Sequence, residues 1–338
     1  MAGAKFRSTP PWAAANFHAM SESSPTSPAV PQPTRGRVFL RRLSSSLILW
    51  SVVLGAMFSG HDLLSDAIFL VIMAGLSAVG LMEFYGLVEK RGLGCFKREG
   101  ILGGMLLMVS TFICFSGVVD WVSHHEAPAK ANDFEVSFLI LFVLGLCVRQ
   151  FISRANTAGI LAISTTLFGL MYVPWLLNFI QKIYYFPRYA APGTGAFFVL
   201  YFILVTKMSD TGAYCVGSLI GRHKMVPRIS PGKTWEGFAG ALIFSVCGSV
   251  IFAKLAGARL GTTLYPGGMP LCHAALLGLI LAIAAVVGDL IESIFKREAG
   301  VKDSGGMFPG IGGILDLLDS LLFNAPLMYL YLRHVLTN

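Results

Sequence analysis

The sequence has few charged residues for its length. Only 13% of its 338 residues are Asp, Glu, Lys or Arg, whereas soluble domains carry about 25%. Acidic residues are the scarcer kind, with 18 against 26 basic ones. A soluble protein of this size could not cover its surface with so few charges. With 55% hydrophobic residues, the composition excludes a disordered chain, a coiled coil and an ordinary cytosolic enzyme, and it is typical of an integral membrane protein.

The patterns of several common sites are also missing. The six cysteines form no CxxC pair, so they predict neither a zinc site nor a disulfide framework. No Ser, His and Asp pattern favours acyl transfer. The formal net charge of +8 predicts no nucleic-acid partner, because a membrane protein carries its excess of basic residues in cytoplasmic loops.

Long apolar runs, in contrast, are abundant. A spanning helix needs about 20 mostly apolar residues, and the runs predict an all-α, polytopic integral membrane protein with about nine transmembrane helices. The predicted spans are 43–60, 64–82, 101–119, 136–152, 157–180, 194–208, 237–256, 271–290 and 313–332. The fourth and sixth are short, and the apolar stretch 209–220 either extends the sixth span or forms a re-entrant piece.

The loop charges predict an orientation. If the N-terminus is cytoplasmic and nine spans alternate, 20 of the 26 basic residues fall on the cytoplasmic side. This bias predicts an N-in, C-out arrangement. We expect the protein in a bacterial inner membrane, with its active site on the cytoplasmic side.

Three regions follow from the composition along the chain. Residues 1–36 are rich in Pro and Ser and have no apolar period, so we predict a disordered extension. A transit peptide, a plain tail and a start-site artefact, with Met20 as the true start, all remain open. We expect N-terminal transmembrane helices over 37–190 and a catalytic transmembrane region over 191–338.

Two of the predicted cytoplasmic loops carry dense polar motifs. The first holds SDTGAY at 209–214 and SPGKTWEG at 230–237, and the second runs from 288 to 319. Their basic residues are interleaved with Gly and Ser, which suits phosphate binding because glycine lets backbone N–H groups approach an anion closely. These basic residues are Arg222, Lys224, Lys233, Lys296, Arg297 and Lys302. A P-loop is rejected, since Pro227 replaces its first glycine and no strand is expected there.

The acidic residues of the second loop form two pairs at helical spacing. Asp289 and Glu292 are three residues apart and share a helix face with Ser293 and Lys296, and the same spacing separates the later aspartates, 316 and 319. Carboxylates that converge at a membrane surface repel one another unless a partner neutralises them. A divalent cation such as Mg²⁺ would do so, and structural ion pairs with the nearby lysines are the alternative.

Carboxylates for a metal and basic residues for phosphate, at a membrane surface, favour phosphoryl or nucleotidyl transfer. The motifs also resemble a known signature. It reads S-x-x-K-R, four residues, K-D, and onward to G-G-x-x-D-x-x-D, matched here by Ser293, Lys296, Arg297, Lys302, Asp303, Gly312, Gly313, Asp316 and Asp319. This pattern, with the two motifs of the first loop, resembles phosphatidate cytidylyltransferases (CDP-diglyceride synthases) over about residues 200–325. Two positions differ, with Ile311 where that family has His and Leu317 where it has Arg.

The resemblance implies that CTP and phosphatidate react to give CDP-diacylglycerol and pyrophosphate. With the residue chemistry, it gives the expected site residues. Catalytic roles are expected for Lys233, Lys296, Arg297, Lys302 and Asp303, substrate binding for Arg222, Ser230 and Ser304, and Mg²⁺ binding for Asp210, Asp289, Asp316 and Asp319. The resemblance also allows a second, monovalent cation, a homodimer and contact with membrane lipids.

Two other functions fit parts of the pattern. A CTP-dependent polyprenol or phytol kinase would share the membrane setting and the phosphate-binding loops, but a hydroxyl acceptor would want a base near the metal, and none is evident. A transporter that couples to ions through buried acids would carry acids in mid-span and an internal repeat. Here the acids gather at the loop ends.

Overall fold

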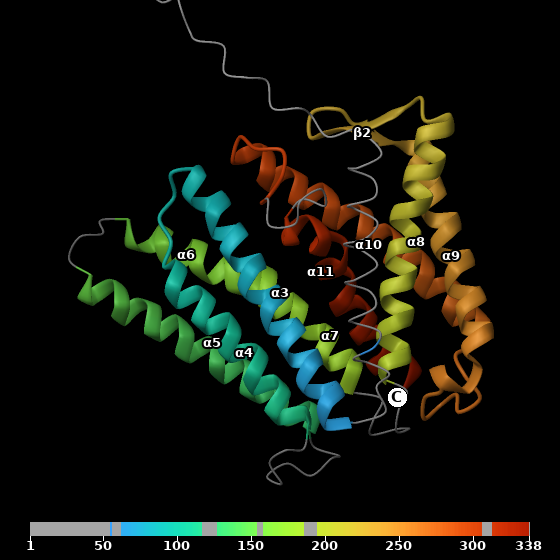
Figure 1. The fold of residues 1–338 in the computed structure, drawn as a ribbon, viewed down its shortest axis with the longest axis horizontal. Coiled ribbons are helices and arrows are strands. Elements are labelled where there is room, and N and C mark those ends of the chain that lie inside the picture. Colours follow the sequence, from blue (N-terminus) through green and yellow to red (C-terminus); the bar gives the residue numbers. More distant parts are fainter. Residues whose placement is uncertain are drawn as a thin grey trace, which may run out of the picture. The chain divides into compact units, whose positions relative to one another are not determined.

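The computed structural model describes residue 55 and residues 62–116, 127–153, 158–185, 195–305 and 313–337. The predicted N-terminal extension and, apart from Gly55, the predicted first span lie outside these residues. The helices are α3 (Asp62–Lys90), α4 (Lys97–Ser116), α5 (Ala127–Ile152), α6 (Gly159–Leu170), α7 (Leu176–Tyr185), α8 (Gly195–Ile220), α9 (Trp235–Ala256), α10 (Leu271–Glu298) and α11 (Ile314–Tyr331) (Figure 1).

Eight segments of the described chain are long and apolar enough to cross a membrane. A π-helical turn at Met171–Trp175, which contains Pro174, joins α6 and α7 into one of them. Large apolar side chains point outward along the helices, as at Phe151, which is 89% exposed, and Ile160, which is 87% exposed. Such a surface suits lipid, where only a helix or a closed barrel can satisfy every backbone polar group. The protein is an integral membrane protein.

The predicted short sixth span is longer in the structure. Helix α8 continues to Ile220, so the stretch 209–220 extends the span, and the re-entrant alternative is wrong. Close packing against α9 accommodates this stretch: a Cβ on Gly212 would lie 2.5 Å from the carbonyl oxygen of Gly240. Small residues allow this approach of two helix backbones.

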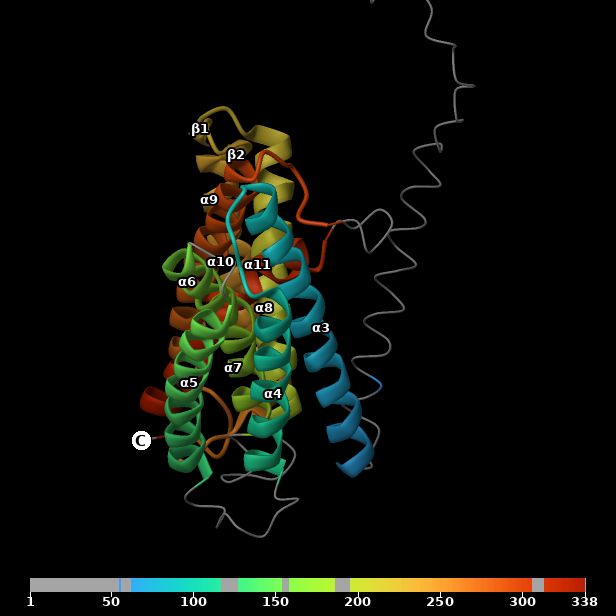
Figure 2. The same cartoon turned by 90° about the vertical axis from the view of Figure 1, so that its left-hand side faces the viewer.

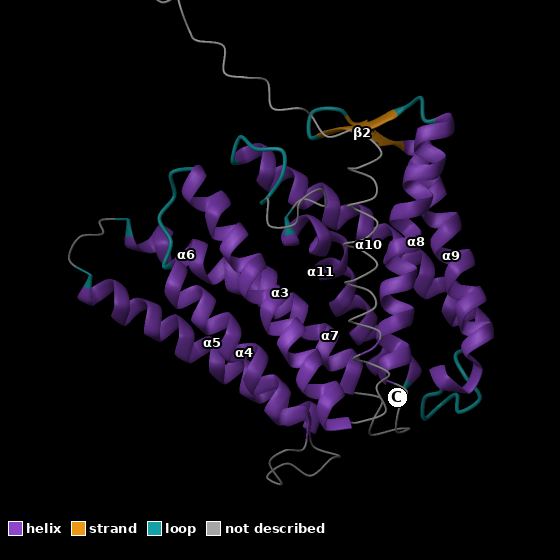
Figure 3. Cartoon of the chain, viewed as in Figure 1, coloured by secondary structure: helices purple, strands orange, loops and turns teal. Residues whose placement is uncertain are grey.

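One hairpin interrupts the helical architecture (Figure 3). Strands β1 (Lys224–Val226) and β2 (Ser230–Thr234) pair antiparallel between α8 and α9. Thr234 ends β2 and caps α9, because its hydroxyl accepts a hydrogen bond of 3.1 Å from the Gly237 N–H. The expectation of no strand here was therefore wrong, although Pro227 still breaks the P-loop pattern.

Helices α8 to α11 bring the two polar loops to the same end of the molecule. The hairpin follows α8, and the described loop residues after α10, 299–305, lie near it in both views (Figures 1 and 2). Helices α10 and α11 touch closely, since a Cβ on Gly288 would lie 2.7 Å from the carbonyl oxygen of Asp319. This contact sets the acids of the two helices side by side.

A buried ion pair joins α5 and α7. Glu135 and Lys182, which the span prediction had placed in outer loops, lie inside these helices, 4% and 2% exposed. Lys182 Nζ is 2.6 Å from Glu135 Oε2, and Asn178 Nδ2 donates to Glu135 Oε1 at 2.8 Å. Charges placed within an apolar span persist there because they neutralise each other.

Replacing Lys182 by Met is expected to lower the free energy of unfolding by about 3–5 kcal/mol, because it leaves the Glu135 carboxylate buried without its cation. Thermal unfolding in detergent measures the effect. The double replacement of Glu135 and Lys182 by Met should recover most of the loss. Arg149→Met serves as the control, since the half-exposed Arg149–Glu99 pair should contribute at most about 1 kcal/mol. Equal losses in the single and double variants would contradict this account.

Candidate active site

A cavity of about 500 Å³ lies where the two polar loops meet. Helix α8, the hairpin, the start of α9, α10 and α11 all contribute to its wall. The wall combines carboxylates, lysines, glycine backbone and two aromatic rings, those of Tyr214 and Phe238. A largely apolar cavity with a few charged groups in its wall is a candidate site for a charged ligand.

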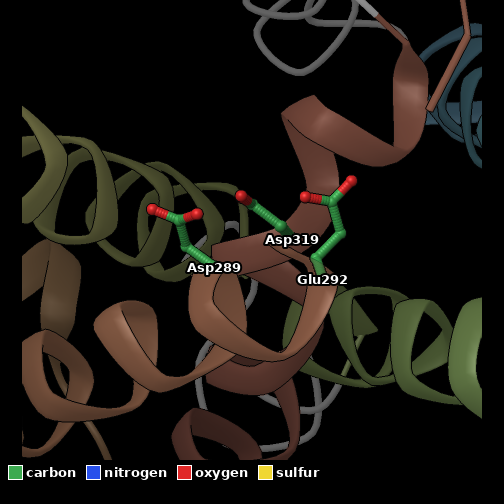
Figure 4. Close-up of side chains that lie close together, drawn as sticks. All are labelled: Asp289, Glu292 and Asp319. Atoms are coloured by element: carbon green, nitrogen blue, oxygen red, sulfur yellow. The ribbon is translucent and has the colours of Figure 1, made fainter. Parts of the chain in front are cut away.

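Three carboxylates converge beside this cavity. Oxygen atoms of Asp289, Glu292 and Asp319 lie within 4.8 Å of one another, and Figure 4 shows the Asp319 side chain between the other two. The first two share a face of α10, and α11 supplies the third. Glu292 is fully buried and Asp319 is 9% exposed, so their mutual repulsion is only weakly screened.

Three lysines neutralise part of this negative charge. Lys233 Nζ, from β2, lies 2.8 Å from Asp289 Oδ2. Lys296 contacts both Glu292 and Asp316, with 2.7 Å to the Asp316 Oδ1 atom.

On α8, Lys207 Nζ lies 3.1 Å from Asp210 Oδ2, and it also approaches the carbonyl oxygen of Leu317 at 3.5 Å. Counting the described residues of the site, five carboxylates face three ammonium groups, which leaves a formal charge of −2. The structural ion pairs expected from the sequence do form, yet they do not balance the acids.

The carboxylate cluster fits a hard divalent cation. Its potential metal ligands are all oxygen atoms, which Mg²⁺ prefers. Neither oxygen of Glu292 forms a hydrogen bond of regular geometry, although Lys296 is in ion-pair contact with the carboxylate. Buried polar atoms without a hydrogen bond are unusual in native proteins.

Comparison with known proteins identifies the family. A sequence model of the cytidylyltransferase family matches residues 40–335. The chain belongs to the cytidylyltransferase family. It is 34% identical to a phosphatidate cytidylyltransferase of Staphylococcus haemolyticus over 76% of this chain and 86% of that protein. It is 32% identical to one of Chlamydia pneumoniae over 88% of this chain and 92% of that protein. The resemblance found in the motifs is confirmed, and the protein is a nucleotidyltransferase enzyme.

Of the site residues predicted for this cytidylyltransferase, five line the cavity. They are Asp210, Lys233, Asp289, Asp316 and Asp319. Asp316 is drawn toward the neighbouring backbone, since its Oδ2 atom accepts from Gly313 N at 2.8 Å and from Ser304 N at 3.3 Å. It therefore lies beside the three-carboxylate cluster and is not one of its members.

The other predicted residues lie outside the cavity wall. Arg297 donates from Nε to the carbonyl oxygen of Ile229, at 3.2 Å, and so ties α10 to the hairpin. Ser304 is 5% exposed and its hydroxyl donates to Glu83. The exposed residues of this group are Arg222, Arg297, Lys302 and Asp303, and Ser230 and Lys296 are partly buried. Ile311 lies outside the described residues.

Three residues of the site were not predicted. Glu292 was recognised on the face of Asp289 but was not chosen as a metal ligand, and Lys207 was counted only as a loop charge. Glu83, on α3, accepts two hydrogen bonds from the start of α11 and a third from the Ser304 hydroxyl in the loop after α10. The signal for Glu83 was faint, a single acid directly after the predicted span 64–82.

Proposed function

We propose that this enzyme transfers the cytidylyl group of CTP to phosphatidate, giving CDP-diacylglycerol and pyrophosphate for phospholipid biosynthesis. The observation that carries the proposal is the cavity in which buried carboxylates and lysines meet at one end of the membrane helices. The relatives named phosphatidate cytidylyltransferase support the lipid acceptor. The relatives are bacterial, which supports an inner-membrane location. We also propose that the site lies on the cytoplasmic side.

The reaction needs charge neutralisation more than a base. An oxygen of the lipid phosphate attacks the α-phosphorus of CTP in line, and the bond to the bridging oxygen breaks as pyrophosphate leaves. Since the lipid phosphate is already an anion near neutral pH, no proton has to be removed from it. The obstacle is repulsion between two anions, which positive groups in the site lower.

Three residues would hold Mg²⁺, namely Asp289, Glu292 and Asp319. A bound Mg²⁺ supplies charge stabilisation on phosphoryl oxygens and a template for alignment. In this set Glu292 takes the place of Asp210 and Asp316 of the sequence prediction, because the oxygen atoms that lie within 4.8 Å of one another belong to Asp289, Glu292 and Asp319. The second, monovalent cation and the homodimer stay predictions.

The lysines would divide the substrate phosphates between them. Lys233 projects from the hairpin to Asp289, and we assign it to the triphosphate and the departing pyrophosphate. Lys296 contacts both Glu292 and Asp316, so we assign it to holding the Glu292 carboxylate in the cluster. Tyr214 and Phe238 in the cavity wall offer ring faces for the cytosine.

The test uses purified protein in detergent with CTP, Mg²⁺ and phosphatidate. The expected products are CDP-diacylglycerol and pyrophosphate in equal amounts, and chelation of Mg²⁺ should stop their formation. A polyprenol offered in place of phosphatidate separates the kinase alternative, since a kinase would release CDP and give a lipid monophosphate. Release of CDP, or no product with phosphatidate, would refute the proposal.

A further inference from the structure

Glu83 is an acid inside a membrane-spanning segment, Ser65–Lys90. Within the described part of the chain, no Lys or Arg forms an ion pair with it, whereas four acids of the candidate site have lysine partners: Asp210, Asp289, Glu292 and Asp316. An ionised carboxylate in such a segment needs partners that offset its lost hydration. Its partners are hydrogen-bond donors at the beginning of α11 and the Ser304 hydroxyl in the loop after α10.

Both carboxylate oxygens of Glu83 are used. Oε1 accepts from Ile314 N at 3.0 Å, and Oε2 accepts from Leu315 N at 2.9 Å and from the Ser304 hydroxyl at 3.1 Å. The first N–H groups of a helix lack partners within the helix and carry partial positive charge. Gly313 is the N-cap of α11 and has no side chain to accept them, so Glu83 caps this helix from another one.

The surroundings are shaped to admit this carboxylate. A Cβ on Gly305 would lie 2.3 Å from Glu83 Oε1, and a Cβ on Gly313 would lie 2.4 Å from Glu83 Oε2. One turn earlier on α3, a Cβ on Gly80 would lie 2.9 Å from a methyl group of Val173, and this position also adjoins Leu318 of α11. Three glycines thus let α3, the loop and α11 close around one side chain.

We propose that Glu83 is a positioning residue for the metal-binding carboxylates, acting through the start of α11. Asp316 and Asp319 lie on the first two turns of this helix, so its starting direction decides where Asp319 stands relative to Asp289. Glu83 does not line the cavity, and it acts without touching substrate. The effect of Glu83 on catalysis rests on the proposed function, whereas its effect on the direction of α11 rests on its hydrogen bonds alone.

The test compares Glu83→Gln with the parent protein. Gln keeps the size of the side chain but loses the charge, and its amide offers one acceptor oxygen to three donors. The expected result is a rise of about 10-fold or more in the Mg²⁺ concentration that gives half of the Mg²⁺-induced increase in unfolding temperature, a usual penalty for removing a group that orients a metal ligand. Activity at varied Mg²⁺ should show the same displacement, with kcat recovering at high Mg²⁺.

The control is Glu89→Gln, which lies on the same helix and pairs with Lys97 at the surface; its Mg²⁺ midpoint should match the parent. Should the Gln variant fail to fold, Glu83→Asp keeps the charge but shortens the side chain, and a smaller rise is expected. A parent-like Mg²⁺ midpoint in the folded variant, with only a lower unfolding temperature, would mean a purely structural role and would overturn the proposal. A parent protein that binds Mg²⁺ but makes no CDP-diacylglycerol would instead refute the proposed function alone.

Discussion

Replacing Asp319 by Asn is expected to reduce the formation of CDP-diacylglycerol by at least about 10³-fold, which corresponds to about 4 kcal/mol of transition-state stabilisation. Asp319 supplies the α11 side of the carboxylate cluster, and Asp289 and Glu292 both come from α10. Without it, the remaining acids lie on one helix face and cannot surround a cation. The loss should appear in kcat at saturating CTP, measured in detergent.

The same variant makes a second measurement informative. In the absence of Mg²⁺, Asp319→Asn removes one of several like charges in a poorly hydrated cluster, so the unfolding temperature should stay level or rise. The increase that Mg²⁺ produces in the parent should disappear. Glu298→Gln, an exposed acid at the end of α10, is the control and should retain activity. Substantial turnover in Asp319→Asn would remove this residue from the site.

Replacing Lys233 by Met is expected to lower kcat/KM for CTP by about 10²–10³-fold. Its ammonium group lies in the cavity wall, 2.8 Å from Asp289 Oδ2 and 3.3 Å from the carbonyl oxygen of Val286. Because its partner Asp289 is 38% exposed at the side chain, losing the lysine should harm the fold little. The deficit should therefore appear as weaker binding and slower reaction of the triphosphate, measured by steady-state kinetics over CTP concentration.

The hairpin itself offers the matched control for this experiment. Lys224 lies on β1, opposite Thr234 in the register of the hairpin, and is exposed outside the cavity wall. Lys224→Met removes the same charge from the same element, so it accounts for any general electrostatic attraction of CTP to the protein. Equal losses in the two variants would assign the effect to that general attraction and not to a contact made by Lys233.

Most of the membrane helices could be predicted because a span must satisfy its backbone polar groups internally, which only a long apolar helix does here. The predictions failed where polar residues continue a helix. The predicted sixth span ended at 208 and left the extension of α8 open, because Lys207 and Asp210 interrupt the apolar run; both contact α11, at the Leu317 carbonyl oxygen and the Ser320 hydroxyl. Glu135 and Lys182 were assigned to loops for the same reason. A charged residue is taken as the end of a predicted span unless its partner is known.

The site could be predicted in composition but not in arrangement. Helical spacing correctly placed Asp289 and Glu292 on one face. Which acid of α11 joins them depends on how α10 and α11 cross at Gly288, and this crossing has no local sequence signal. Glu83 could not be predicted for another reason. Its partners are mainly backbone N–H groups more than 200 positions away, and every residue except proline has such a group.

The long separation between Glu83 and its partners has a consequence for how the protein is made. Ile314 follows Glu83 by 231 positions, so α3 leaves the ribosome and meets the membrane long before α11 exists. Until then the carboxylate lacks the hydrogen-bond donors that offset its lost hydration, since they have not been synthesised. A chain cut before α11 would keep this acid in its membrane segment without the backbone donors that stabilise it in the complete fold.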